Sequence, residues 1–193
     1  VNETAVANYT AVITNASAYD GTVTNNHTPI VTELNVTKVW DDNNNQDGVR
    51  PVSVTVELFA DGVKINETVL NADNDWKFTF PDLAVYKNNG TLIVYTVNET
   101  AVANYTAVIT NASAYDWTVT NNHTPIVTEL NVTKVWVDAD NQDGVRPPSV
   151  TVELFADGVK INEAVLNEGN DWKWTFPNLP VYKDGVVIKY TVN

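Results

Sequence analysis

Apolar and polar residues alternate along most of the chain, the spacing that places every second side chain on one face of a β-strand. Pairs such as Asp61-Gly62 and Asn89-Gly90 interrupt the alternation and are typical of tight turns. About seven short strands in some 95 residues, without helical periodicity, predict an all-β fold of the immunoglobulin-like sandwich type. The expected inward-facing positions are Leu34, Val36, Lys38 and Trp40, then Val54, Val56 and Leu58, and then Trp76, Phe78 and Phe80.

The chain also repeats itself. Three segments recur unchanged 96 residues later, namely 1–20 at 97–116, 22–40 at 118–136, and 54–67 at 150–163. One residue is missing from the second copy near Asn88 and Asn89. A fixed period of this length is the signature of tandem copies of one domain.

The repeat does not begin and end with the chain. We place the boundary at the His-Thr-Pro-Ile stretch, residues 27–30 and 123–126, because proline followed by a short polar run breaks strand pairing. Residues 31–125 then form one complete domain, residues 1–30 the back of a domain, and residues 126–193 the front of the next. Tandem domains run end to end, so we expect the two partial domains at opposite ends of the complete one. They would then pair between neighbouring chains, or belong to a longer array.

Three polar residues fall on inward-facing positions of the predicted strands. Lys38 is in register with Val36 and Trp40, and Glu99 and Asn121 are likewise in register with apolar residues. An unpaired charge is costly to bury, so each group must find a partner or change its ionisation. In the divided copy, the corresponding residues are Lys134, Glu3 and Asn25.

A lysine, a glutamate and an asparagine that converge in an apolar core make one reaction possible. Desolvation lowers the pKa of a lysine and raises that of a carboxyl group, which gives a neutral amine nucleophile and a proton-shuttling acid. Attack of the amine on the asparagine carboxamide would expel ammonia and leave an isopeptide bond. The residues alone leave two alternatives open: an ordinary salt bridge beside a hydrogen-bonding asparagine, or side chains that reach water at the strand ends.

Longer motifs surround these residues. The strings NVTKVWDDNNNQDGVRPVSVTVELFADG, NDWKFTFPDLAVY, YTVNETAVANYT and TVTNNHTP resemble the Cna B-type repeat domain of collagen-adhesin and pilin surface proteins, over essentially the whole chain. The resemblance implies tandem immunoglobulin-like sandwiches, each closed by a bond from the lysine of V-T-K-V-W to the asparagine of T-x-T-N, with catalytic assistance from the glutamate of Y-T-V-x-E. Those roles fall on Lys38, Asn121 and Glu99, and in the divided copy on Lys134, Asn25 and Glu3.

The amino-acid composition excludes several classes of binding partner and site. The net charge of -13 and the isoelectric point near 4.3 disfavour nucleic acids and anionic membranes. Cysteine is absent, so disulfides cannot stabilise the chain. No apolar run approaches the roughly 18 residues of a membrane span. We expect no cofactor and no metal: residues 41–48 resemble a calcium loop but lack its distal glutamate, which favours a plain polar loop. His27 and His123 are interpreted as surface residues.

Sequons suggest the compartment. Asn-x-Ser/Thr occurs twelve times, a density that suits a glycosylated, secreted surface. The glycosylation candidates are Asn8, Asn15, Asn35, Asn66, Asn89, Asn104, Asn111 and Asn131.

The leading hypothesis is a structural one. Each domain is a covalently locked spacer in an extracellular, cell-surface stalk or filament, whose partners are its own neighbours and whose distant tip binds a host or cell-surface ligand. No catalytic turnover is expected beyond one intramolecular bond per domain. In a rival hypothesis, the domains themselves bind a host protein or glycan. In a third, residues 1–30 of one chain complete residues 126–193 of another, head to tail.

Overall fold

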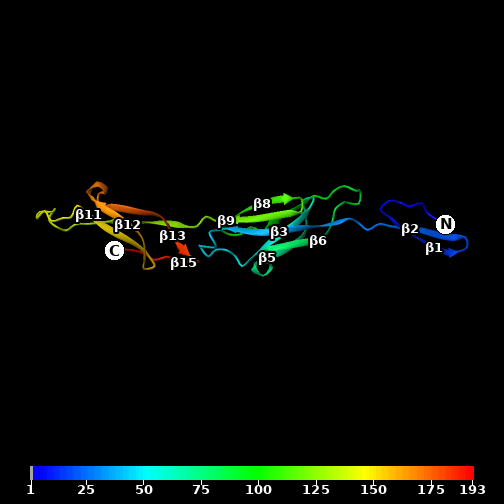
Figure 1. The fold of residues 1–193 in the computed structure, drawn as a ribbon, viewed down its shortest axis with the longest axis horizontal. Helices are drawn as coiled ribbons and strands as arrows, with labels where there is room; N and C mark the ends of the chain where they lie inside the picture. Colours follow the sequence, from blue (N-terminus) through cyan, green and yellow to red (C-terminus); the bar gives the residue numbers. More distant parts are fainter. Residues whose placement is uncertain (1) are drawn as a thin grey trace.

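The computed structural model describes residues 2–193, which form three groups of β-strands in a row (Figure 1). The N-terminal hairpin lies at one end, a two-sheet sandwich lies in the middle, and a second set of sheets lies at the other end. The two chain ends are therefore far apart. Within residues 2–193, no helix has the length and apolar character to cross a membrane.

The middle group is a closed sandwich of seven strands. Its strands are β3 (Val31–Asp41), β4 (Ser53–Ala60), β5 (Val63–Asn71), β6 (Lys77–Ala84), β7 (Tyr95–Glu99), β8 (Thr106–Ser113) and β9 (Asp116–Asn122). One sheet has the order β6-β3-β9-β8 and the facing sheet has the order β5-β4-β7. The pair β3 and β9 is parallel, whereas the other pairs are antiparallel. The first and last strands of the sandwich are thus direct neighbours.

Alternation explains the core of this sandwich. The side chains predicted to point inward from β3 and β4 are buried except Trp40, which is half-buried against the core. Phe80 of β6 is 1% exposed. Phe78 is opposite Val36 and therefore shares the inner face, but β6 is an edge strand and Phe78 is 39% exposed. The prediction that Phe78 is buried in the core is wrong for that reason.

Turns also follow the sequence. Asp61 and Gly62 have φ angles of 49° and 82° and connect β4 to β5, as the Asp-Gly pair predicts for a tight hairpin. The helical segments of residues 2–193 are two single 3-10 turns, η1 (Ala72–Asn74) and η2 (Glu168–Asn170). The all-β prediction is confirmed.

The N-terminal group is one hairpin, β1 (Thr10–Ser17) and β2 (Asp20–Asn26), whose residues are all exposed. It corresponds in sequence to β8 and β9 of the sandwich. Because no second sheet covers it, its apolar side chains, such as Val12 and Ile13, face solvent.

The C-terminal group repeats the front of the sandwich. Its strands are β10 (Val127–Thr133), β11 (Ser149–Ala156), β12 (Val159–Asn167), β13 (Lys173–Pro180), β14 (Tyr182–Lys183), β15 (Val186–Val187) and β16 (Tyr190–Val192). Strand β10 pairs with β13, and the facing sheet has the order β12-β11-β16. Among the described residues of this group, five apolar side chains are buried: Leu154, Ala164, Leu166, Phe176 and Leu179. Counterparts of β8 and β9 are missing from this group.

Strand β10 is shorter than its counterpart β3, although residues 31–40 and 127–136 are identical. The last part of β3 is paired with β9 up to Asp41. No equivalent strand lies beside β10, so residues after Thr133 lose the ladder that would hold them extended. The ten identical residues are therefore all in a strand in one copy, whereas only seven of them are in the other.

Backbone hydrogen exchange should report this difference. We expect the amides of residues 135–137 to exchange at the rate of an open peptide, whereas those of residues 39–41 are strongly protected, because only the latter lie beside a parallel partner. Exchange followed by peptide-level or residue-level detection measures both segments in one sample. Equal protection of the two segments would contradict the missing-partner explanation.

Candidate functional site

The parallel pair β3 and β9 brings two of the predicted site residues to one face. Lys38 is opposite Val119, and Asn121 lies two positions further along β9, so both side chains point into the sandwich. Glu99 is in β7 of the facing sheet, opposite the buried Val56. The lysine and asparagine therefore come from the first and last strands, and the glutamate reaches them across the core.

The lysine and glutamate form a buried ion pair. The distance from Lys38 Nζ to Glu99 Oε1 is 3.5 Å, and their side chains are 0% and 2% exposed. Lys38 Nζ also donates hydrogen bonds to the carbonyl oxygens of Val39 and Val119, at 3.0 and 3.3 Å. Because the lysine side chain is fully enclosed, the alternative in which it extends to water does not hold.

Aromatic rings close this pocket. Lys38 Nζ lies 4.2 Å from the ring centroid of Trp40, which in turn makes edge-to-face contacts with Trp76 and Tyr105. Burial lowers the pKa of Lys38 to about 8, and the attraction of Glu99 only partly opposes this effect. The amine thus loses its proton more readily than an exposed lysine would.

Asn121 is the unusual member of the group. It is 0% exposed, yet within residues 2–193 neither its Oδ1 nor its Nδ2 has a hydrogen-bond partner. Oε1 of Glu99 likewise accepts no hydrogen bond from this part of the chain. Each unsatisfied buried polar atom costs about 1–3 kcal/mol. The arrangement thus differs from the alternative of a salt bridge beside a hydrogen-bonded asparagine, because in the described chain the Asn121 carboxamide makes no hydrogen bond.

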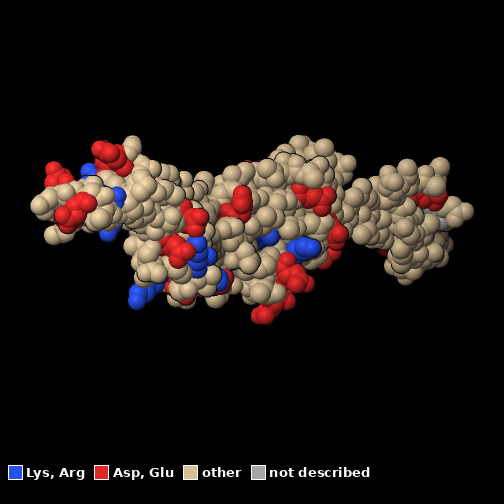
Figure 2. Space-filling view, turned by 60° about the vertical axis from the view of Figure 1, so that its left-hand side comes forward, with Lys and Arg blue, Asp and Glu red and all other residues tan. Residues whose placement is uncertain are grey.

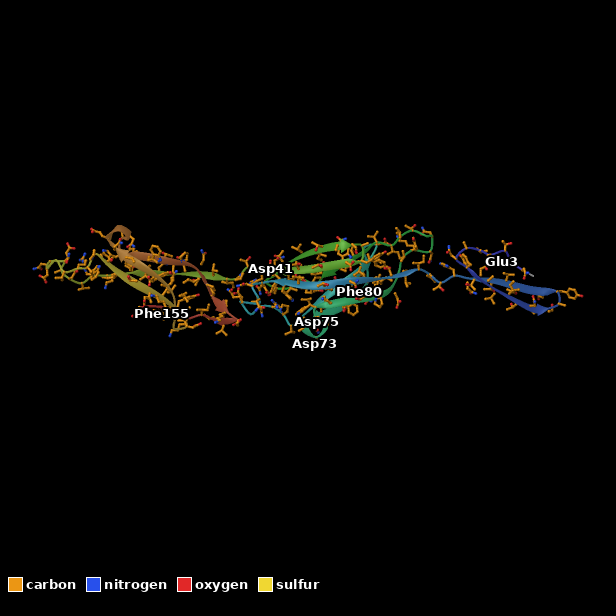
Figure 3. All side chains as sticks on the ribbon, in the orientation of Figure 1. Glu3, Asp41, Asp73, Asp75, Phe80 and Phe155 are labelled. Carbon is orange, nitrogen blue, oxygen red and sulfur yellow. The ribbon has the colours of Figure 1, made fainter. Side chains whose placement is uncertain are left out.

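The divided copy separates the same three residue types. Asn25 Nδ2 donates to Glu3 Oε1 at 2.8 Å in the N-terminal hairpin, where both side chains are exposed (Glu3 is labelled in Figure 3). Lys134 lies in the C-terminal group, half-buried, with its Nζ 4.4 Å from the ring of Trp136. The chain therefore places Glu3 and Asn25 together and Lys134 at the opposite end of the row.

Sequence reasoning did not find a second buried cluster around Asp42. Its Oδ2 accepts hydrogen bonds from Arg50 Nε at 2.8 Å and from the Tyr105 hydroxyl at 2.8 Å. Its Oδ1 accepts from Arg50 Nη2 at 2.6 Å and from the backbone of Asn45 at 2.9 Å. The Arg50 guanidinium lowers the pKa of Asp42 to about 2, and burial with this carboxylate raises that of Tyr105. Asp42 thus links the polar loop of residues 41–48 to Arg50 and Tyr105.

His123 differs from its sequence interpretation. It was predicted to be a surface residue, but its side chain is only 10% exposed and its Nε2 lies 2.9 Å from Asp47 Oδ2. The Asp47 hydrogen bond raises the pKa of His123 above the ordinary histidine value. The contact joins loop residues separated by 76 positions, which strand alternation gives no means of pairing. His27 keeps the exposed position that was expected.

The sequon asparagines differ in accessibility. Asn35 is half-buried and uses both amide atoms, donating to Asp116 at 3.1 Å and accepting from Thr79 at 2.7 Å. The other seven candidates are exposed: Asn8, Asn15, Asn66, Asn89, Asn104, Asn111 and Asn131. Glycan attachment remains a prediction for these seven, and Asn35 is the least accessible acceptor.

Acidic side chains are spread along the surface. Figure 2 shows red carboxylates at several places on the middle and C-terminal groups, with blue cations beside some of them. Lys64, for example, lies 2.7 Å from both Glu57 and Glu67. The visible face has no large basic patch of the kind that binds nucleic acid.

Comparison with known proteins decides the family. A sequence profile of the Cna protein B-type domain matches residues 34–122 and 130–193, which together cover more than half of the chain. The chain belongs to the Cna B-type domain family. Membership in this family of repeat domains assigns the chain a structural role and no enzymatic turnover.

Two relatives extend the comparison. The chain is similar to the collagen adhesin of Staphylococcus aureus, with 43% identity over 194 residues that span 100% of this chain and 16% of the adhesin. It is also similar to the crystal structure of two B repeat units of the collagen binding protein of Staphylococcus aureus, with 42% identity and a TM-score of 0.79. That match covers 97% of this chain and 49% of the solved chain. The Cna B-type chain thus spans half or less of these relatives.

The Asp42 cluster should make stability depend on pH. The pKa of Asp42 is lower in the folded protein than in the unfolded chain. Its ionised side chain therefore stabilises the fold at pH values above the ordinary pKa of 3.8, and this stabilisation is lost as pH falls toward about 2. We expect Asp42→Asn to lower the free energy of unfolding by about 2 kcal/mol at neutral pH and less at pH 2. Denaturant unfolding of parent and variant between pH 2 and 7 measures this difference.

Asp138→Asn is the matched control. Asp138 has the equivalent pair with Arg146 at 2.7 Å, but its side chain is 26% exposed, against 1% for Asp42. Solvent screens this exposed pair, so its loss should matter less. The explanation fails if the Asp42→Asn difference does not shrink between pH 4 and pH 2.

Proposed function

We propose that the chain is a structural segment of an extracellular, cell-surface stalk, in which an isopeptide bond between Lys38 and Asn121 locks the complete domain. The observation that carries the proposal is the buried group of Lys38, Glu99 and Asn121, in which the asparagine has no hydrogen-bond partner within the described chain. The family and its Staphylococcus aureus relatives support a surface role. Collagen binding belongs to those relatives by name, and this chain matches only part of them.

The reaction balances without a cofactor. The neutral Nζ of Lys38 attacks Cγ of Asn121, the new Nζ–Cγ bond forms, and the Cγ–Nδ2 bond breaks. Glu99 takes a proton from the attacking nitrogen and delivers it to the departing amide nitrogen, which leaves as ammonia. The lowered pKa of Lys38, about 8, increases the neutral fraction of the nucleophile. Rigid neighbouring strands hold the reacting groups together, so the bond forms once and no turnover follows.

The position of the bond suits a load-bearing stalk. It would join the first and last strands of the sandwich, β3 and β9. The enclosed loop has more than 80 residues, and closing such a loop stabilises a fold by about 4–5 kcal/mol in the chain-entropy model. Tension that enters β3 would pass through the bond to β9, so the strands between them carry little of the load.

The partial domains, residues 1–30 and 126–193, complement each other in this proposal. The segment of residues 1–30 supplies Glu3 and Asn25, whose Oε1 and Nδ2 atoms are 2.8 Å apart. The segment of residues 126–193 supplies Lys134. Residues 1–30 of one copy would add the two strands that residues 126–193 of a neighbour lack, and a Lys134–Asn25 bond would then join the copies head to tail. Residues 31–125 are the intervening complete domain. The exposed sequons are the places where glycans would cover the surface.

The intact mass of the fully denatured chain tests the bond in the complete domain. We expect the monomeric parent to be lighter than its formula by one molecule of ammonia, because one amide nitrogen leaves when Lys38 joins Asn121. Lys38→Ala and Asn121→Ala should each restore the full formula mass, and Glu99→Ala should slow or prevent the loss. Chains are separated by size under denaturing conditions before the measurement.

Lys134→Ala is the control for that experiment, since it removes the equivalent lysine from the divided copy and should leave the ammonia deficit of the monomer unchanged. A parent at its full formula mass would overturn the cross-link, and the three buried residues would then be a structural polar cluster. In that event, the hypothesis that the domain binds a host protein or glycan directly would take first place.

Head-to-tail joining gives a separate prediction. Concentrated parent chain should form a ladder of covalent oligomers on a denaturing gel, because Lys134 and Asn25 can meet only between copies in this arrangement. Lys134→Ala and Asn25→Ala should abolish the ladder, whereas Lys38→Ala should keep it. A strictly monomeric chain that nevertheless lacks one ammonia would contradict joining between copies while leaving the Lys38–Asn121 bond intact.

A further inference from the structure

The connection from the complete sandwich to the next group of strands is held by one buried carboxylate. Asp47, in the loop between β3 and β4, has a side chain that is 0% exposed. Its Oδ2 accepts a hydrogen bond from the backbone of Ile126 at 2.8 Å and lies 2.9 Å from His123 Nε2. The loop of one sandwich thus holds both ends of the short segment that leads to β10.

Both ring nitrogens of His123 face acceptors. Nδ1 lies 2.9 Å from the carbonyl oxygen of Asn104, and Nε2 faces the Asp47 carboxylate. A neutral imidazole can donate from only one nitrogen, so both contacts are hydrogen bonds only when the ring is protonated. The geometry therefore indicates an imidazolium paired with Asp47.

The same loop contacts the following group of strands. The backbone nitrogen of Gly185, in the turn between β14 and β15, donates to the carbonyl oxygen of Gln46 at 3.0 Å. A Cβ added at Gly48 would lie 2.5 Å from Gly185 Cα, so the two backbones meet where only glycine fits. Figure 1 shows this loop of the middle sandwich reaching toward β15.

The other copies of these residues in the chain do not make the same contacts. Asp143 and Gly144 correspond to Asp47 and Gly48, but Asp143 is exposed, and a Cβ at Gly144 would meet nothing within 4 Å. His27 corresponds to His123, and its Nδ1 keeps the contact with the carbonyl oxygen of Asn8 at 2.8 Å. Within residues 2–193, its Nε2 has no carboxylate partner like Asp47. Identical local sequence therefore does not create the contacts. The Asp47–His123 contact needs the front and the back of one complete sandwich, and the contacts of Ile126 and Gly185 need the segment that follows it.

The first junction has a hollow at the corresponding place. A cavity of about 430 Å³ is lined by Tyr9, His27, Ile30, Tyr86 and Gly90, among others. The residues equivalent to His27 and Ile30 at the second junction are His123 and Ile126, which Asp47 holds. The hollow thus lies at the place that corresponds to residues 46–48 of the second junction.

We infer that residues 42–50 form a docking surface that fixes the direction of each repeat relative to the next, with His123 protonated in the docked state. The occupant of this surface is the linker and the β14–β15 turn of the following repeat. The inference is independent of the isopeptide bond, which lies in the core of a single sandwich. It gives the stalk stiff joints between its locked domains.

The surroundings of His123 favour the charged ring. Asp47 faces Nε2, Asp42 adds a second negative charge from the same loop, and the ring of Tyr105 lies 5.4 Å away. Arg50 is bound to Asp42 and partly offsets its charge. The pKa of His123 is raised in the docked state. Its protonated ring therefore stabilises docking fully at pH values below the ordinary pKa of 6.5, and this stabilisation is lost as pH rises through the raised pKa.

A pair of spin labels can measure how firmly the middle sandwich is held to the C-terminal group of strands. The chain has no cysteine, so Asp73→Cys and Glu168→Cys introduce a unique labelled pair on the exposed 3-10 turns of the two groups. Double electron–electron resonance should give one narrow distance distribution at about pH 5.5. Gly48→Ala should widen it about two-fold or more, because domains without a firm interface move relative to each other.

Gly144→Ala is the matched control, since the φ angles of Gly48 and Gly144 are 69° and 67° and only Gly48 has Gly185 beside it. Asp47→Asn should also widen the distribution, and Asp143→Asn should not. If Gly48→Ala leaves the width of the parent unchanged in a folded protein, the docking surface is refuted. Circular dichroism and the intact mass establish folding of each variant, so a loosened joint is distinguished from an unfolded sandwich.

A separate experiment tests whether protonation of His123 stabilises the docked state. The parent distribution should widen as pH is raised from about 5.5 to 9, and His123→Gln should remove this pH dependence, whereas His27→Gln should retain it. A pH-dependent width that persists in His123→Gln would assign the titration to another group and overturn the protonated-joint inference.

Discussion

The parallel pairing of β3 with β9 is the contact on which the rest of the structure depends. It closes the larger sheet, covers the facing sheet and aligns Lys38 with Asn121 on the inner face. It also keeps β3 extended to Asp41, after which the polar loop begins. The C-terminal group lacks this pairing, and there the corresponding strand ends at Thr133 and Lys134 remains half-buried.

Closing the sandwich has an electrostatic cost. Lys38 and Glu99 lose their water, and Asn121 loses its hydrogen-bond partners. Buried ion pairs stabilise proteins little, because desolvation cancels most of their attraction. A covalent amide would remove the charge of the lysine and one of the polar groups of the asparagine. This cost supports the proposal that the three residues are the reactants of a cross-link.

The row of domains raises a second mechanical question, which is how one domain is held to the next. A cross-link within a sandwich resists unfolding but leaves the linker free to bend. The buried Asp47 carboxylate, which contacts His123 and Ile126, restrains that linker, and the Gly48–Gly185 approach brings two domains into backbone contact. The proposed cross-link and the proposed joint thus use different residues: Lys38 of β3 for the first, and the loop after β3 for the second.

Alternation and repetition were enough to predict the all-β class, the buried faces of β3 and β4, and the inward direction of Lys38, Glu99 and Asn121, because a strand exposes its faces with a fixed period of two. Phe78 was misjudged because the period gives the face of a residue but not its distance from the sheet edge. The Asp42–Arg50–Tyr105 cluster and the Asp47–His123 joint were decided only by the tertiary structure. Their members lie in loops, which have no period, and their partners are up to 76 residues apart and meet only after the sandwich has closed.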